Sequence, residues 1–128
     1  MKPLKDFDIK RETKGGVTVL RLIGLLDDYT FPRLQTALRS LQQGGHNRVV
    51  VNCEDIDYIS STGLRSIVEF ARTARESKGD MILVNVPDKC RSIIDVLGFA
   101  KELKLLADEK AAIKQLTPPE EPAEGGKK

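Results

Sequence analysis

With 128 residues, the chain is long enough for one domain that buries a packed core without staples. Its 21 basic and 19 acidic residues leave a formal net charge of +2, and both signs are spread along the sequence. A surface for nucleic acid or an anionic membrane would need clustered basic residues, so neither partner is expected.

The sequence also lacks the apolar segments that target a chain to a membrane. No run approaches the roughly 18 apolar residues of a membrane span, and no apolar segment of a signal peptide follows Met1. Cys53 and Cys90 lie in apolar segments without a second Cys or His at metal-ligand spacing, and we expect buried, reduced thiols. These features predict a soluble cytoplasmic protein with no direct membrane insertion.

A β-hairpin is predicted at the start of the chain. Residues 7–9 offer a short first strand, and Gly15-Gly16 is typical of a hairpin turn. The β-branched run 17–23 is the expected second strand. Residues 24–28 are expected to form the loop that follows it.

An amphipathic helix and a buried strand come next. Thr30 is the predicted N-cap, with Pro32 in the first turn, and Gly44-Gly45 ends the helix. The apolar residues of this helix recur at helical spacing: Phe31, Leu34, Leu38 and Leu41. Residues 48–53 contain three consecutive valines, a run typical of a strand covered on both faces.

The second half of the chain repeats this alternation. Residues 64–71 carry the apolar stripe of a second helix, and residues 81–86 predict another buried strand. A third helix is expected from Pro87 to Gly98. Its inward-facing residues are predicted to be Cys90, Ile93, Ile94 and Leu97.

A short edge strand and a last helix complete the predicted order. Leu103 and Leu105 mark the edge strand, and Asp108 caps the helix. The order β-β-α-β-α-β-α-(β)-α, in which the short edge strand is optional, indicates a mixed sheet with helices packed upon it. Residues 117–128 are rich in Pro, Glu, Gly and Lys, and we expect them to form a disordered tail.

One octet, Asp57 to Leu64, carries the functional signal. It places three hydroxyl residues, Ser60, Ser61 and Thr62, where the third strand ends and the second helix begins. The unpaired N–H groups and the macrodipole of a helix start favour a hydroxyl cap, and they favour a phosphate equally well. The octet therefore predicts either a structural cap or a phosphorylation switch.

From about residue 7 to residue 116 the chain resembles the STAS domain family, whose best-known members are bacterial anti-anti-sigma factors. Gly24-Leu25-Leu26-Asp27 is similar to the family's Gly-x-Leu-Asp loop, residues 49–52 to its central strand, and residues 59–65 to its strand-to-helix signature. The resemblance implies an α/β fold, with a mixed sheet of four to five strands and about four helices. It also implies one STAS domain over residues 1–116.

The resemblance further implies a phosphorylation switch. The family's phosphorylated serine stands two positions before the glycine, which is Ser61 here. Ser60 stands where many members have an acidic residue, and Ser60 and Thr62 are alternate acceptors. Unmodified, the chain would bind an ATP-bound anti-sigma factor that is a serine kinase. Phosphorylation would release that partner, and a serine phosphatase would restore the binding.

On this reading the chain is a substrate and not an enzyme, and it needs no cofactor or metal. The residues expected to contact the partner come from the loop before the first helix and from the octet with its next residue: Asp27, Asp28, Tyr58, Ser60, Ser61, Thr62, Gly63, Leu64 and Arg65.

Two other functions are alternatives to the switch. Some STAS domains serve as docking subunits of transporters or signalling assemblies, with no covalent cycle, and the same loops would then form a docking surface. A small nucleotide-binding enzyme is disfavoured, because the chain has no Gly-x-x-x-x-Gly-Lys loop and its only histidine, His46, lies far from the octet in sequence.

Overall fold

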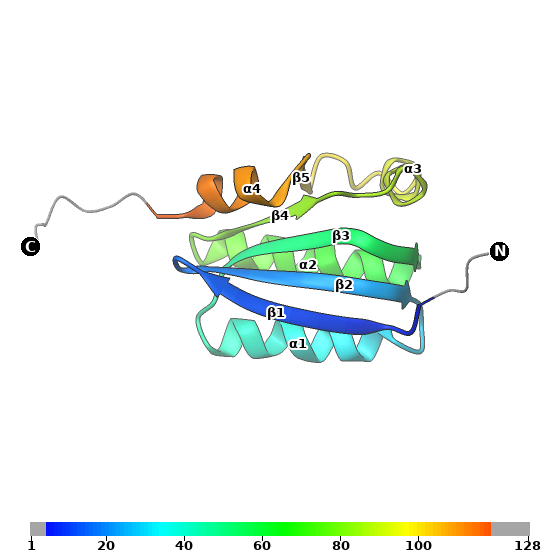
Figure 1. The fold of residues 1–128 in the computed structure, drawn as a ribbon, viewed down its shortest axis with the longest axis horizontal. Coiled ribbons are helices and arrows are strands. Elements are labelled where there is room, and N and C mark those ends of the chain that lie inside the picture. Colours follow the sequence, from blue (N-terminus) through cyan, green and yellow to red (C-terminus); the bar gives the residue numbers. More distant parts are fainter. Residues whose placement is uncertain (1–4, 119–128) are drawn as a thin grey trace, which may run out of the picture.

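The computed structural model describes residues 5–118, which form one five-stranded sheet and four helices (Figure 1). The elements in chain order are β1 (Asp8–Lys14), β2 (Val17–Leu26), α1 (Phe31–Gln43), β3 (Arg48–Ile59), α2 (Ser61–Glu76), β4 (Asp80–Val84), α3 (Asp88–Val96), β5 (Lys104–Leu106) and α4 (Glu109–Leu116). The predicted fold class and element order are confirmed. Most of the predicted tail, residues 119–128, lies outside the described residues.

The strands lie side by side in the order of the sequence, from β1 to β5. β1 runs antiparallel to β2, and β2 to β5 are parallel. The three helices between parallel strands cross over in the same direction along the sheet. Because such crossovers are right-handed as a rule, α1, α2 and α3 are expected on one face. The side chains of these three helices accordingly share one core, and α4 packs on the opposite face (Figure 1).

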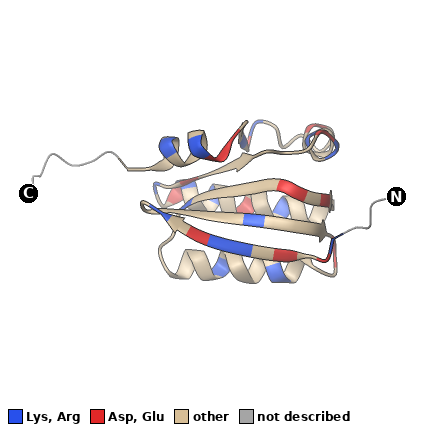
Figure 2. Ribbon diagram, viewed as in Figure 1, with Lys and Arg blue, Asp and Glu red and all other residues tan. Residues whose placement is uncertain are grey.

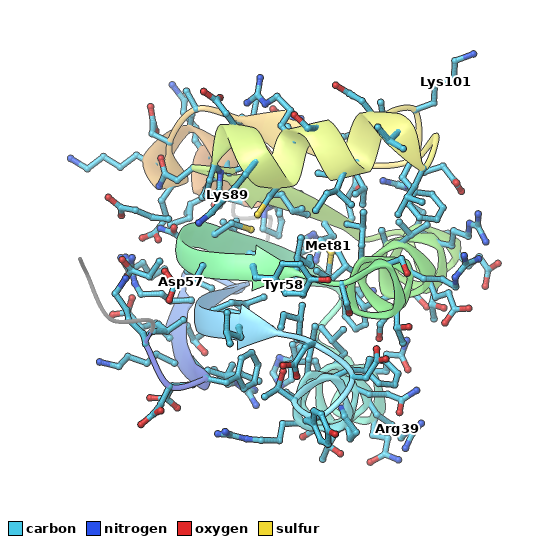
Figure 3. The ribbon with its side chains drawn as sticks, turned by 90° about the vertical axis from the view of Figure 1, so that its right-hand side faces the viewer. Arg39, Asp57, Tyr58, Met81, Lys89 and Lys101 are labelled. Carbon is cyan, nitrogen blue, oxygen red and sulfur yellow. The ribbon has the colours of Figure 1, made fainter. Side chains whose placement is uncertain are left out.

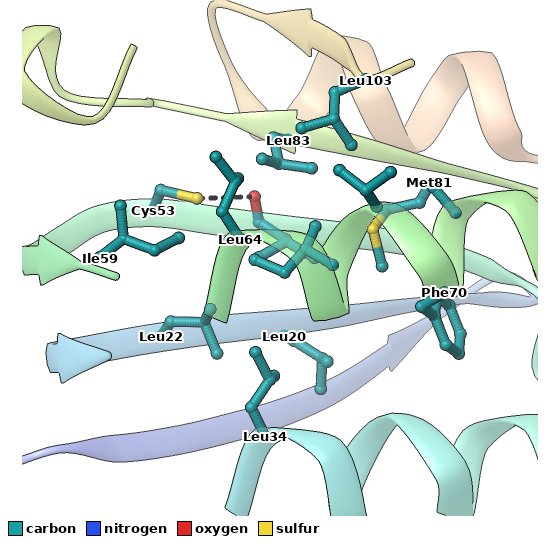
Figure 4. Close-up of a cluster of buried hydrophobic side chains, with 14 of the residues drawn as sticks. Leu20, Leu22, Leu34, Cys53, Ile59, Leu64, Phe70, Met81, Leu83 and Leu103 are labelled. Atoms are coloured by element: carbon teal, nitrogen blue, oxygen red, sulfur yellow. Dashed lines mark hydrogen bonds between the residues drawn. The ribbon is translucent and has the colours of Figure 1, made fainter. Parts of the chain in front are cut away.

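Both faces of the central strands are covered, as the valine run predicted. Val49 and Val51 face the larger core, which Leu64 of α2 enters among the side chains of β3 and β4 (Figure 4). Val50 faces α4 together with Ile82. Burying one aliphatic side chain stabilises the fold by about 1.5–3 kcal/mol. The buried valines therefore fix the position of β3, the strand that leads to the octet.

The predicted loop at residues 24–28 is wrong for its first three residues. β2 continues to Leu26 because Leu25 and Leu26 pair with Tyr58 and Ile59 of β3. β3 itself runs six residues beyond the predicted 48–53, to Ile59. Gly24 has φ +88°, and a Cβ at this position would lie 2.6 Å from the Lys5 carbonyl oxygen. The glycine thus lets the N-terminal segment cross close to the sheet.

Two further predictions need correction. The first strand runs over residues 8–14 and is longer than the predicted 7–9. Leu97 does not face inward: α3 ends at Val96, Gly98 takes φ +78°, and Leu97 is 37% exposed. Cys53 and Cys90 are buried free thiols, as predicted, and burial raises the pKa of both.

Candidate functional site at the start of helix α2

The ends of β2 and β3 bring the loop before α1 and the octet side by side. Leu26 and Ile59 are register partners, and the N–H of Ser60 donates to the Leu26 carbonyl oxygen at 2.7 Å. The turn at residues 27–30 therefore begins beside the start of α2. Figure 3 looks onto this end of the molecule, where Asp57, Tyr58 and Lys89 lie.

Ser60 is the N-cap of α2. Its backbone is extended, with φ −83° and ψ 163°, and its Oγ accepts the N–H of Gly63 at 3.0 Å. Its carbonyl oxygen accepts the N–H of Leu64 at 2.9 Å. Only 8% of the residue is exposed, so the hydroxyl is committed to the structural role that helix starts favour.

Ser61 and Thr62 are the exposed first residues of α2. The N–H groups of a first helical turn have no acceptors within the helix, and the macrodipole adds partial positive charge there. A phosphate on Ser61 would meet this favourable end of the helix while the Ser60 cap stays in place. The three hydroxyls of the octet thus differ in accessibility, which the sequence did not reveal.

Gly63 and Leu64 position the start of α2 against the sheet. A Cβ on Gly63 would lie 2.7 Å from Cγ of Leu26, so only glycine lets α2 start this close to β2. Leu64 is fully buried in the larger core. These two predicted contact residues therefore offer a partner no side-chain surface, and they fix where Ser61 stands.

An apolar hollow adjoins Ser61, between the start of α2 and helix α3. Tyr58 is 48% exposed and Val96 is 84% exposed, and the two apolar side chains border the same hollow. The residues that line the hollow come from β3, the start of α2 and α3: Tyr58, Ile59, Ser61, Ser92, Ile93, Val96 and Leu97. The contribution of α3 was missed, because Leu97 was assigned to the inward face.

Charged and turn-forming residues surround this surface. The Asp57 carboxylate accepts the backbone N–H of Lys5 at 2.8 Å, and this bond holds the pKa of Asp57 below its usual value. Asp57 thereby ties the N-terminal segment to β3. Arg65 is exposed, and its guanidinium carbon lies 5.8 Å from the centre of the Phe99 ring.

The turn before α1 is built by Asp27 and Thr30. Oδ1 of Asp27 accepts the N–H groups of Tyr29 and Thr30 at 3.0 and 3.1 Å. Thr30 occupies the N-cap position without a side-chain cap bond, since its hydroxyl donates instead to the Leu25 carbonyl oxygen at 2.7 Å. Asp27 is thus a structural residue, whereas Asp28 and Tyr29 point to solvent.

Within residues 5–118, no group of three or more His, Cys, Asp or Glu side chains is placed to hold a metal ion. In the same residues, every helix is too short or too polar to cross a membrane.

The order of elements and the strand-to-helix signature agree with a family comparison. The model of the STAS domain matches residues 8–112. The chain belongs to the STAS domain family. This membership confirms the resemblance to the STAS domain family.

Relatives of this STAS domain are named for one role. BtrV of Bordetella bronchiseptica, whose name assigns it to the anti-sigma factor antagonists, is 27% identical over 97 residues, which are 76% of this chain and 84% of BtrV. The anti-sigma-B factor antagonist of Staphylococcus aureus is 26% identical over 94 residues, covering 73% of this chain and 87% of that protein.

Solved structures share the fold. An anti-sigma factor antagonist from Mycobacterium paratuberculosis superposes with a TM-score of 0.79 at 19% identity, covering 88% of this chain and 96% of that one. The unphosphorylated form of the anti-sigma factor antagonist SpoIIAA has a TM-score of 0.70 at 20% identity, covering 86% and 96%.

Proposed function

We propose that this STAS domain is an anti-sigma factor antagonist whose partner binding is controlled by phosphorylation of Ser61. Its relatives at 26–27% identity carry that name. The observation that carries the proposal is the contrast between two adjacent hydroxyls. Ser60 is buried and caps α2, whereas Ser61 is exposed beside the hollow that Tyr58 and Val96 border.

The proposed cycle has three steps in the cytoplasm. The unmodified protein binds an anti-sigma factor that is a serine kinase with bound ATP, and the sigma factor is released. The kinase then transfers the γ-phosphoryl group of ATP to Oγ of Ser61, so that ADP and a proton leave and the complex dissociates. A serine phosphatase hydrolyses the phosphoserine and restores binding.

The site accounts for a switch that leaves the domain folded. Phosphate adds a charge of about −1.5 to −2 at neutral pH, and at a helix N-terminus this charge is tolerated or favoured. A partner that covers the apolar hollow would instead take this charge out of water, and none of the residues lining the hollow is Lys or Arg. Burying an unpaired charge costs several kcal/mol, and each ~1.4 kcal/mol weakens affinity tenfold.

The test is to incubate the purified protein with the serine kinase encoded nearest to it and with ATP, and to map phosphate by mass spectrometry. We expect phosphate on Ser61 in the wild type and none in Ser61→Ala. Ser61→Glu should weaken kinase binding at least about tenfold in calorimetry, because it places a permanent charge beside the hollow. Thr62→Ala and Ser92→Ala are matched controls for the phosphate map, since each removes another hydroxyl of this surface and should leave the phosphate on Ser61.

The alternative function has a distinct outcome. Stable binding to another partner, with no phosphate on Ser60, Ser61 or Thr62, would indicate a docking subunit of a transporter or signalling assembly. Phosphate incorporation that is unchanged in Ser61→Ala would refute Ser61 as the acceptor.

A further inference from the structure

Strand β1 is a rim of the sheet with an open side. It pairs with β2 on one side only, and among the described residues no strand pairs with its other side (Figure 1). Every residue of Asp8–Lys14 is exposed except the half-buried Ile9. Unpaired N–H and C=O groups along such an edge can accept a further strand.

The hairpin turn determines which backbone groups point outward. Gly15 and Gly16 form a two-residue turn, and both have positive φ, as a type I′ turn requires. The residues flanking such a turn, Lys14 and Val17, form a hydrogen-bonded pair, and hydrogen-bonded pairs alternate along an antiparallel ladder. The backbone groups of Ile9, Arg11 and Thr13 therefore point away from β2.

The other residues of β1 carry alternating charges on one face of the sheet. Figure 2 shows the acidic and basic positions along this strand. Register places these side chains opposite Val17, Val19, Arg21 and Ile23, on the α4 side of the sheet. In chain order the charged residues of that face are Asp8, Lys10, Glu12 and Lys14.

We propose that β1 is a self-association edge, which pairs antiparallel with β1 of a second copy about a two-fold axis at Arg11. In this register Lys10 lies opposite Glu12 of the second copy, and Asp8 lies opposite Lys14 of the second copy. The two-fold axis repeats each pair, so all four charged positions of the face meet an opposite charge. The outward groups of Ile9, Arg11 and Thr13 supply the ladder, and the two sheets become continuous. The Ile9 N–H donates to Oδ1 of Asp8 at 2.8 Å in the free chain, so pairing exchanges that bond for one to the second copy.

The charge pattern selects this register over its neighbours. Moving the axis to residue 10 places Lys10 opposite itself and Asp8 opposite Glu12. Moving it to residue 12 places Glu12 opposite itself and Lys10 opposite Lys14. Like charges directly opposite one another destabilise a sheet, so both shifts are disfavoured.

Charged side chains on an edge strand usually prevent such pairing, but here the pattern is complementary to itself. The one like-charge pair is Arg11 with its own copy, on the other face, where long exposed side chains are screened by salt. Three of the four ions already have neighbours. Asp8 lies 3.8 Å from Arg33, and Lys14 lies 3.5 Å from Glu109 and 3.8 Å from Glu12, so Lys10 is the sharper position to test.

The test is sedimentation equilibrium of the full chain from about 10 μM to 1 mM, because a single strand pair makes a small and weak interface. We expect a reversible dimer that weakens as salt rises. Lys10→Glu should weaken the dimer about tenfold, since it turns two attractive pairs into repulsive ones. The double variant Lys10→Glu/Glu12→Lys restores opposite charges and should recover the wild-type constant.

Two further variants sharpen the result. Lys101→Glu makes the same charge change on an exposed loop distant from β1 (Figure 3), and it should leave the dimer unchanged. Arg11→Thr removes the like-charge pair at the axis and should tighten the dimer. A monomer throughout the concentration range would overturn the proposal. So would a dimer that Lys10→Glu leaves intact, or a double variant that stays as weak as Lys10→Glu with an unchanged circular dichroism spectrum.

Discussion

Adjacent hydroxyls at Ser60 and Ser61 have opposite structural roles, and this predicts opposite responses to alanine. Ser60→Ala removes the acceptor of the Gly63 N–H, and we expect the free energy of unfolding to fall by about 1 kcal/mol, the usual effect of losing an N-cap. Ser61→Ala removes an exposed hydroxyl and should change it by less than about 0.5 kcal/mol. Urea unfolding measures both. Equal effects would show that the cap is not formed as described.

The cap also explains a departure from the family pattern. Many members carry an acidic residue at the position of Ser60, and Asp and Ser are about equally good N-caps. Either residue can accept the N–H that Ser60 accepts here from Gly63. The substitution therefore preserves the start of α2 and the place of Ser61, and it removes one negative charge beside the proposed phosphate.

At the scale of helices and strands, ion pairs join α2, β4 and β5. Asp80 begins β4, and its carboxylate accepts bonds from Lys104 of β5 at 2.6 Å, Arg75 of α2 at 3.0 Å and the N–H of Met81 at 2.8 Å. Burial works against the charged form of Asp80, but these bonds outweigh it and lower its pKa below 3.8. A carboxyl whose pKa is lower in the folded state than in the unfolded state stabilises the fold at pH values above its unfolded-state pKa. This contribution disappears as pH falls through the pKa of the folded state.

Replacing Asp80 with asparagine should therefore have a pH-dependent effect. At pH 7, Asp80→Asn should lower the free energy of unfolding by about 1 kcal/mol, because charge-assisted bonds of a part-exposed group are lost. The difference from the wild type should shrink as pH is lowered from about 5 to 2, where the wild-type carboxyl becomes protonated. Unfolding curves across this range measure it, with Asp95→Asn as a control at an exposed carboxyl of α3. A difference that is constant with pH would contradict the ionised role of Asp80.

Local patterns predicted the elements well, and they failed where tertiary pairing decides. The stripe from Leu64 to Ala71 defines α2, because helical spacing is a local property. The polar residues Glu54, Asp55 and Asp57 concealed the last half of β3, since its pairing with β2 is not visible in either segment alone. Leu97 fits the apolar spacing of α3, yet the positive φ of Gly98 turns the chain before Leu97 can pack.

The same distinction holds for the site. The octet could be recognised as a helix start because a cap is encoded within a few residues, and the choice of Ser61 within it came from the family resemblance. The burial of Ser60 and the exposure of Ser61 became visible only in the three-dimensional structure. The hollow could not be predicted, because β3 and α3 are distant in sequence and meet only through the order of strands in the sheet.

At the scale of the whole molecule, the two proposed surfaces lie on different parts of the sheet. Ser61 follows the end of β3, the central strand, whereas β1 is the rim. The β1 edge faces away from β2, and the hollow beside Ser61 opens between β3 and α3. Self-association through β1 would therefore leave both Ser61 sites of a dimer accessible, and each copy could bind its partner independently.

Because the two surfaces are independent, a variant of one surface should leave binding through the other surface unchanged. Ser61→Glu should lose affinity for the kinase while its self-association constant stays within about twofold of the wild type, because distant sites add within 0.3–0.5 kcal/mol. Lys10→Glu should weaken the dimer, and its affinity for the kinase, counted per chain, should stay within about twofold of the wild type. Calorimetry with the kinase and sedimentation equilibrium of the free protein give the two constants for each variant. A Ser61→Glu protein that also fails to dimerise would show that the start of α2 and the β1 edge are coupled, which a rigid sheet between them does not allow.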